Sequence, residues 1–76
     1  MTDINAQSCR AARALLGWSM ADLAQHAAIA LQTIQRIESG KPFYESTGLK
    51  LIETFRAHGV EVLLPPAYGA RVIPHS

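Results

Sequence analysis

The sequence has few of the features on which a secreted, membrane-spanning or disordered protein depends. Its single cysteine, Cys9, cannot form an internal disulfide, so the fold does not require an oxidising compartment. The apolar runs are only a few residues long, and the N-terminus has no basic region followed by an apolar segment. We therefore expect a soluble protein of the cytoplasm, without a signal peptide or a membrane span.

Charge is also sparse. Charged residues make up 17% of the chain, and 7 Lys and Arg against 6 Asp and Glu give a net charge of +1. A dedicated nucleic-acid domain usually has a clearly basic surface, so any affinity for a polyanion must depend on where the charges lie. Apolar residues, at 49%, exclude a disordered tail protein. The 76 residues make one small domain, which a second subunit would help to stabilise.

Patterns of catalytic and metal-binding residues are missing. The chain has no Ser-His-Asp set, phosphate loop or paired-carboxylate motif, and its length leaves little room for a closed catalytic pocket. His26, His58 and His75 are scattered without a carboxylate or cysteine at ligand spacing, which indicates surface histidines. Cys9 shares a helix face with Ala12, which favours a small buried residue over a reactive thiol. We expect no enzymatic activity, no cofactor and no metal.

The first half of the chain contains signals for two helices. Strong helix formers predict a helix over residues 6–16, which Asn5 can cap and Gly17 can end. Ser19 and Asp22 form a variant of the capping box, which predicts a short second helix from Ser19 to Ala27. The apolar residues expected on the buried stripe of this second helix are Leu23, Ala24 and Ala27.

Two further helices are predicted after a short connection. Residues 31–38 form the third, because Ile34 and Ile37 lie three positions apart and Ser39 and Gly40 mark an end. The fourth runs from about Thr47 to His58 and stops at Gly59. Its apolar residues at helical spacing are Leu49, Ile52 and Phe55.

The tail has a different character and predicts a β-hairpin over residues 60–76. A β-branched segment at 60–64 and a second strand at 70–73 are separated by Pro65, Pro66 and Gly69. We expect residues 1–59 to form the main domain and the hairpin to be an extension of it. Two strands alone are marginally stable, and an apolar edge can pair with a copy of itself. The expected apolar face contains Val60, Val62 and Leu64, with Leu63 on the other face.

The segment "RAARALLGWSMADLAQHAAIALQTIQRIESGK" carries an ordered series of motifs. Arg-x-x-x-Gly is followed by an aromatic residue and Ser, then Asp-Leu-Ala, then Ile-x-x-Ile-Glu-x-Gly-Lys. Over about Cys9 to Val60, the chain resembles the Xre-like helix-turn-helix regulators, the superfamily of the phage lambda repressor and Cro proteins. The resemblance implies a mainly α, four-helix lambda-repressor-like domain that binds double-stranded DNA, here with a short C-terminal β-hairpin.

The resemblance places a recognition helix at residues 31–38. With the two isoleucines inward, the candidate base contacts are the outward residues Leu31, Gln32, Gln35 and Arg36. Glutamine can read adenine, arginine can read guanine, and leucine can touch a thymine methyl group. The alternative interpretation is that these four residues are only the solvated face of a short helix.

The resemblance also implies contacts that position the protein without reading sequence. Candidate contacts to the DNA backbone are Ser19, Thr33, Lys41 and Tyr44. Ser19 could instead be only a helix cap, and Tyr44 only a loop anchor. Arg13 and Glu38 match positions that pair in the family, so we expect a structural salt bridge between the first helix and the end of the recognition helix. The alternative for this pair is a solvated contact that contributes little.

Three residues depart from the family pattern. Met20 occupies a position where the family usually has a phosphate-binding glutamine, so that contact is absent. Ala28 stands at the left-handed turn position that usually has glycine, and Ala30 stands where the recognition helix usually has its serine cap. Loss of a cap costs about 1 kcal/mol, and a left-handed alanine costs about 1–2 kcal/mol more.

Two functions therefore remain open from the sequence. The first is a sequence-specific DNA-binding regulator, a repressor or antitoxin-like protein, that acts as a homodimer through its C-terminal strands. Dimerisation would join two weak half-sites and so offset the departures from the family pattern. The second is a protein-interaction module on the same helical scaffold, with little DNA binding. A partner protein such as a toxin is compatible with either function.

Overall fold

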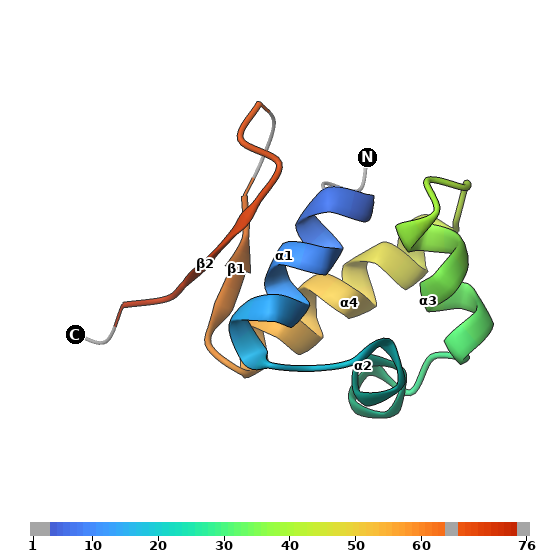
Figure 1. Cartoon of the computed structure of the whole chain (residues 1–76), viewed down its shortest axis with the longest axis horizontal. Helices are drawn as coiled ribbons and strands as arrows, with labels where there is room; N and C mark the ends of the chain where they lie inside the picture. The colour runs from blue at the N-terminus through green and yellow to red at the C-terminus, as the bar shows by residue number, and fades with distance from the viewer. Residues whose placement is uncertain (1–3, 64–65, 75–76) are drawn as a thin grey trace.

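The computed structural model describes residues 4–63 and 66–74, and these form a mainly α fold with a C-terminal β-hairpin, as predicted (Figure 1). None of the helices in this part of the chain is both long enough and apolar enough to cross a membrane. In chain order the elements are α1 (Ala6–Leu16), α2 (Met20–Ala27), α3 (Leu31–Glu38), α4 (Glu45–Ala57), β1 (Val60–Val62) and β2 (Ala70–Val72).

The first two helices begin at the capping residues that the sequence predicted. The Asn5 side chain accepts a hydrogen bond from the Ser8 N–H at 2.9 Å, and the Asn5 N–H donates to Ser8 Oγ at 2.9 Å. Ser19 and Asp22 form the same reciprocal pair at 3.0 and 2.9 Å. Ser19 itself has extended backbone angles, so α2 starts one residue later than predicted, at Met20.

Each of the four helices is followed within two residues by a residue in the left-handed conformation, where side chains are strained. After α1, α3 and α4 this residue is glycine, namely Gly17, Gly40 and Gly59, with φ of 67°, 81° and 83°. At the end of α2 it is Ala28, with φ of 55° and ψ of 44°. The next N–H, from Ile29, donates to the Ala24 carbonyl at 3.0 Å, which closes the end of α2. The turn therefore keeps the usual left-handed shape even though its glycine is missing.

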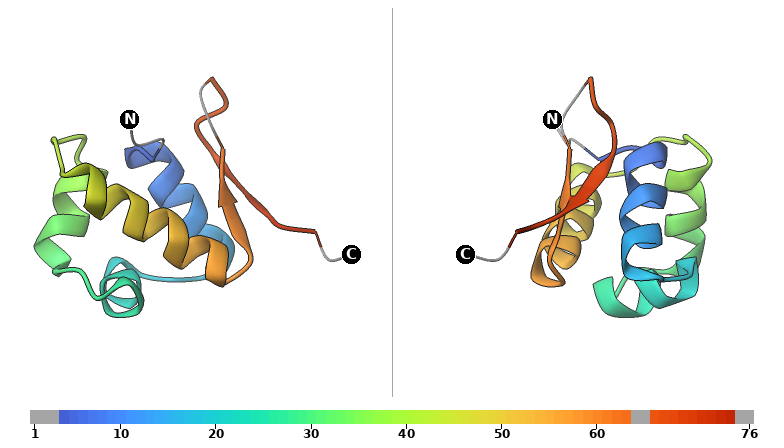
Figure 2. Two further views of the ribbon diagram at one scale, coloured as in Figure 1. Left: turned by 180° about the vertical axis from the view of Figure 1, so that it is seen from behind. Right: turned by 60° about the vertical axis from the view of Figure 1, so that its left-hand side comes forward.

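The helices and the hairpin share one core. Strand β1 lies against α1 and α4, β2 lies against α1, and α2 bridges α3 and α4. The hairpin and α3 lie on opposite sides of α1, at the two ends of the long axis, and this holds in both further views (Figure 2). The core consists of Ile4, Cys9, Ala12, Leu23, Ala27, Ile34, Ile37, Leu51, Phe55, Val60 and Val62.

The fourth helix differs from its prediction in its start and in its buried face. It begins at Glu45, two residues before Thr47. Its buried stripe contains Leu51 and Phe55, both fully buried, whereas Leu49 is 49% exposed. The prediction that Leu49 lies on the buried face was wrong. Leucine and isoleucine occur on both sides of this helix, and the neighbouring elements determine which side is buried.

The hairpin is antiparallel, as predicted, with Val60 opposite Val72 and Val62 opposite Ala70. Both strands are shorter than the predicted ranges 60–64 and 70–73. The predicted face positions of Leu64 and the turn residue Pro65 lie outside the described residues.

Candidate nucleic-acid interface

Helix α3 turns its polar side outward, as its spacing predicted. Ile34 and Ile37 are at most 1% exposed and anchor the helix in the core. Leu31 is 37% exposed, and the residues Gln32, Gln35 and Arg36 are also exposed. Within the part of the chain that the structure describes, no hydrogen bond or ion pair engages the side chains of these last three. Their donors and acceptors are therefore available to an external partner.

The outward side of α3 lies between two hollows. One, of about 410 Å³, separates α3 from the start of α4. The other, of about 390 Å³, lies where α3 meets α1 and the start of α2. Arg36 lines the first hollow and Gln35 lines the second, so the exposed residues of α3 form a ridge with a depression on each flank.

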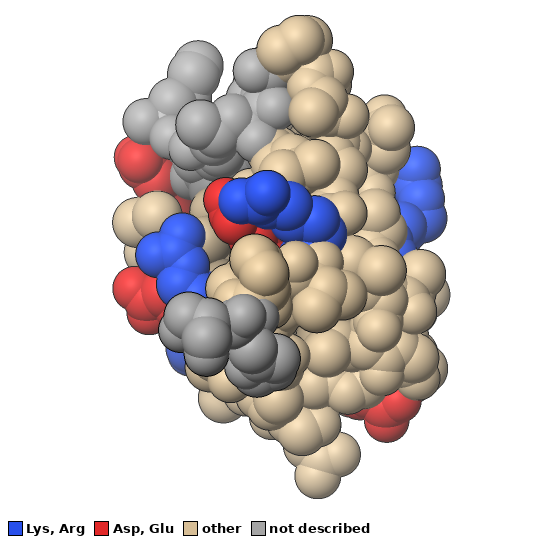
Figure 3. Space-filling model, turned by 90° about the vertical axis from the view of Figure 1, so that its left-hand side faces the viewer, with Lys and Arg blue, Asp and Glu red and all other residues tan. Residues whose placement is uncertain are grey.

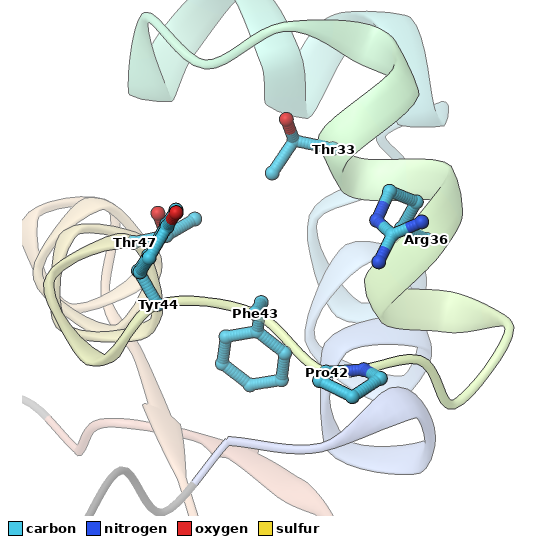
Figure 4. Close-up of a pocket in the computed structure, with 6 residues that line it drawn as sticks. All are labelled: Thr33, Arg36, Pro42, Phe43, Tyr44 and Thr47. Carbon is cyan, nitrogen blue, oxygen red and sulfur yellow. The ribbon is translucent and has the colours of Figure 1, made fainter.

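The hollow on the α4 side gathers two of the predicted backbone-contact residues. Figure 4 shows Thr33 and Arg36 on α3 facing Tyr44 and Thr47 across the gap, with Phe43 and Pro42 on the loop between them. Tyr44 is 84% exposed and precedes α4 as its N-cap residue, but its side chain caps nothing. The Tyr44 side chain therefore does not anchor the loop, which was the alternative role considered for it from the sequence.

Lys41 lies just beyond α3 and is exposed. The left-handed Gly40 turns the chain, and the Lys41 N–H donates to the Arg36 carbonyl at 3.0 Å. The Lys41 backbone therefore has a fixed position relative to α3, while the side chain lines neither hollow.

Ser19 is the N-cap residue of α2. Its N–H and Oγ are both engaged with Asp22. The backbone hydrogen bond from Ser19 and then the hydrogen bond with its side chain lower the pKa of Asp22, so this carboxylate stays ionised at the N-terminus of α2. A negative charge already occupies the end of the helix where an anion would otherwise be favoured.

Arg13 and Glu38 form the ion pair that the family resemblance implied. Arg13 Nε lies 2.6 Å from Glu38 Oε2, and Nη2 lies 2.7 Å from Oε1. The side chains are only 18% and 7% exposed, so the pair is not a solvated surface contact. The hydrogen bond to Glu38 raises the pKa of the Arg13 guanidinium. A further N–H of Arg13 donates to the Trp18 carbonyl at 3.0 Å, which joins the connection between α1 and α2 to the same group.

Cys9 is fully buried, as expected, but it also has a polar contact that the sequence did not suggest. Its thiol donates to Glu38 Oε2 at 3.2 Å. Burial, and then the negative charge of Glu38, raise the pKa of the Cys9 thiol well above its ordinary value. The thiol is therefore a neutral donor that supports the carboxylate bound to Arg13.

Two other features of the structure were not predicted from the sequence, and the first is a contact of Arg10. No partner was predicted for Arg10, whose Nη1 donates to the Glu38 carbonyl at 2.8 Å. Its position one helical turn before Arg13 is the signal that could have assigned it.

The second is an aromatic cluster away from the α3 ridge. His26 stacks on Trp18 with ring centres 4.2 Å apart, and His58 approaches both rings edge-on at 4.8 and 5.0 Å. Two of the three histidines are therefore not scattered, because the C-terminal ends of α2 and α4 converge. In the described residues no group of three metal-binding side chains occurs.

The arrangement of α2, a three-residue connection and an exposed α3 agrees with the comparison to known families. A family model described as helix-turn-helix matches residues 10–55, more than half of the chain. The chain belongs to the helix-turn-helix family. The resemblance to the Xre-like, lambda-repressor-like regulators is thereby confirmed, and with it a DNA-binding regulator at the level of the family. A search of curated proteins found no significant match.

In this helix-turn-helix protein, α2 and α3 are the two helices of the motif, and α1 and α4 support them. The second helix of such a motif is the one that enters the major groove of DNA. The matched residues include all of α2 and α3 and the loop that carries Lys41. The individual base and backbone contacts remain predictions for this chain.

Proposed function

We propose that this protein is a sequence-specific transcriptional regulator, of the repressor or antitoxin-like type, that inserts α3 into the major groove of double-stranded DNA. The observation that carries the proposal is the exposed ridge of Gln32, Gln35 and Arg36, which is flanked by two hollows and whose side chains bond to no other described residue. A ridge between two depressions matches a groove floor between two sugar-phosphate strands.

The residues on the ridge have the chemistry for reading base edges. Gln32 and Gln35 can each form two hydrogen bonds with adenine, and Arg36 can do the same with guanine. Leu31, at the N-terminal end of α3, can contact a thymine methyl group. Each good bidentate contact contributes about 1–3 kcal/mol of discrimination between bases. Candidate contacts to the backbone are Ser19, Thr33, Lys41 and Tyr44.

We further propose that the protein acts as a homodimer through its C-terminal hairpin. The face on which the hairpin lies is mostly uncharged, with one basic side chain resting on an acidic one near its centre (Figure 3). Val72 on β2 is 59% exposed, and Arg71 is paired with Glu61 across the strands at 3.0 Å. The hairpin lies at the opposite end of the molecule from α3, so pairing there leaves the ridge open (Figure 1).

The face proposed for the dimer contact differs from the face predicted from the alternating apolar residues of the first strand. Val60 and Val62 face the core of their own subunit and are 2% and 8% exposed. They are therefore unavailable to a partner, and β2 carries the contact instead. Sedimentation at tens of micromolar tests this: a dimer that Val72→Asp dissociates is the expected result, and a monomeric unmodified chain contradicts it.

The experiment that tests DNA binding is a selection of bound sequences from a random duplex pool, followed by titrations of the selected duplex across salt concentrations. We expect a palindrome whose half-site spacing reports the dimer, and affinity that falls steeply with salt. Lys41→Ala should flatten the logarithmic salt dependence by about one unit per subunit. Gln32→Ala and Arg36→Ala should relax the preference at particular base pairs, and the matched control Arg56→Ala should do neither.

A protein-interaction module is the second candidate. It is favoured by the exposed apolar groups beside the ridge, Leu31 and Tyr44, and by the absence of a hydrogen-bond donor at Met20. Such a module would bind a partner protein, such as a toxin, through the same face. No enrichment of any duplex, together with no salt-dependent affinity, would favour this function over the first.

A further inference from the structure

The hollow between α3, α1 and the start of α2 has a net positive charge. Arg13, one of its two arginines, is neutralised by Glu38 at 2.6 Å. The other, Arg10, is exposed, and within residues 4–63 and 66–74 it donates to an uncharged backbone carbonyl and pairs with no carboxylate. Among its described lining residues, one positive charge therefore remains without a partner; these residues are Arg10, Arg13, Met20, Gln35, Glu38 and Ser39.

Arg10 is held in place before any ligand arrives. Helix α1 runs beside α3 (Figure 2), and the 2.8 Å hydrogen bond from Arg10 Nη1 to the Glu38 carbonyl fixes the guanidinium at the end of α3. A guanidinium has five N–H groups in a planar fork, so most of its donors remain available after this contact. A held guanidinium loses less side-chain freedom when it binds an anion than a mobile one does.

The neighbouring groups on this flank carry no uncompensated positive charge with which to bind an anion. Met20 has no hydrogen-bond donor, and the Ser39 hydroxyl already donates to the Gln35 carbonyl at 2.8 Å. At the start of α2, the Ser19 N–H already donates to the carboxylate of Asp22, so an anion there could use only the uncharged Ser19 hydroxyl. Among the side chains that line this hollow, the Gln35 amide is an uncharged donor, and the Arg10 guanidinium is therefore the charged donor suited to an anion.

We propose that Arg10 binds a phosphate of the DNA backbone in this hollow, on the flank of α3 opposite the hollow that Arg36 lines. The proposal rests on the proposed DNA-binding function and adds to it a residue of α1. Gln35 lines the same hollow and belongs to the ridge of α3, so a duplex read by that ridge brings a strand over Arg10. Guanidinium and phosphate form short, charge-assisted hydrogen bonds, often two in parallel. The α3 ridge would then lie between two arginine-lined hollows.

The test compares the salt dependence of binding to the selected duplex for the unmodified chain, Arg10→Gln, Arg10→Lys and the control Arg56→Gln. Arg56 is an exposed cation near the end of α4, away from both hollows. We expect Arg10→Gln to reduce the logarithmic salt slope by about one unit per subunit, so that its deficit in affinity shrinks about fourfold per subunit between 50 and 200 mM salt. Arg10→Lys should keep the slope, and base preferences should not change.

The logarithmic salt slope of DNA binding distinguishes phosphate binding by Arg10 from a purely structural role of this residue. Arg10→Gln also removes the hydrogen bond to the end of α3, so thermal unfolding of each variant sets a temperature at which all are folded. A slope identical to that of the unmodified chain, while Lys41→Ala lowers it, overturns the inference about Arg10 alone. An unmodified chain with no salt-dependent affinity for any duplex overturns the proposed function, and this inference with it.

Discussion

Arg13 of α1 and Glu38 of α3 are joined by two parallel hydrogen bonds of 2.6 and 2.7 Å, in a position where both side chains are largely shielded from water. Glu38 is the last residue of α3, and its carboxylate also accepts a hydrogen bond from the thiol of Cys9. The same guanidinium reaches the Trp18 carbonyl. This one group therefore determines how the C-terminal end of α3 sits on α1 and on the connection to α2.

Without the Arg13 side chain, the protein should unfold at a markedly lower denaturant concentration. Arg13→Ala leaves Glu38 partly buried without its cation, which should cost about 3 kcal/mol in the free energy of unfolding. The matched control is Arg71→Ala, because Arg71 pairs with Glu61 at 3.0 Å but is 58% exposed. That loss should be below about 1 kcal/mol. Urea unfolding of both variants checks the prediction, and equal losses would show that burial does not decide the strength of these pairs.

Ala28→Gly should stabilise the protein by about 1 kcal/mol. Ala28 has φ of 55°, a conformation that costs a side chain about 1–2 kcal/mol and glycine very little. The control is Ala21→Gly, an exposed position inside α2, where glycine should instead cost about 1 kcal/mol. Opposite signs in thermal unfolding are the expected outcome. A destabilising Ala28→Gly would mean that the turn is not strained.

Ala30→Ser should also be stabilising. Ala30 is the N-cap of α3, with extended angles of −60° and 140°, and no side chain accepts from the first turn of the helix. A serine hydroxyl there can accept one of these N–H groups, which contributes about 1 kcal/mol. Ala14→Ser, at an exposed position within α1, serves as control and should be slightly unfavourable. If both substitutions shift the unfolding midpoint equally, a capping effect is absent.

The buried thiol of Cys9 should make stability fall in alkaline solution. Burial and the charge of Glu38 raise its pKa in the folded protein, whereas the thiol of the unfolded chain ionises near pH 8.5. The contribution of the neutral thiol is fully present below that pH and is lost as pH rises, because only the unfolded form releases the proton. The free energy of unfolding should decrease by up to about 1.4 kcal/mol per pH unit from this group.

Cys9→Ala provides the comparison for the alkaline measurement. All other titratable groups are the same in both proteins, so the difference between the two slopes isolates the thiol. The variant should show a shallower decline between about pH 8.5 and 10 in urea unfolding. A thiol reagent should modify Cys9 only after denaturation. Rapid modification of the folded protein, or parallel pH slopes, would contradict the structure around Cys9.

The sequence by itself determined the local elements and the outward side of α3. Capping by Asn5 and Ser19 depends on residues three positions apart, so it can be read without knowing the fold. The spacing of Ile34 and Ile37 likewise orients α3, because one apolar side must be buried whatever covers it. The series of motifs from Arg13 to Lys41 was sufficient to recognise the family.

Only the tertiary structure decided which of several apolar or basic groups meet. Leu51 rather than Leu49 enters the core, Val62 is buried in that core rather than exposed, and His26 reaches Trp18. Arg10 likewise acquires its place only when the end of α3 comes to lie against α1. These contacts join residues far apart in the chain, and burial depends on the element that arrives opposite, which no periodicity within a single helix or strand specifies.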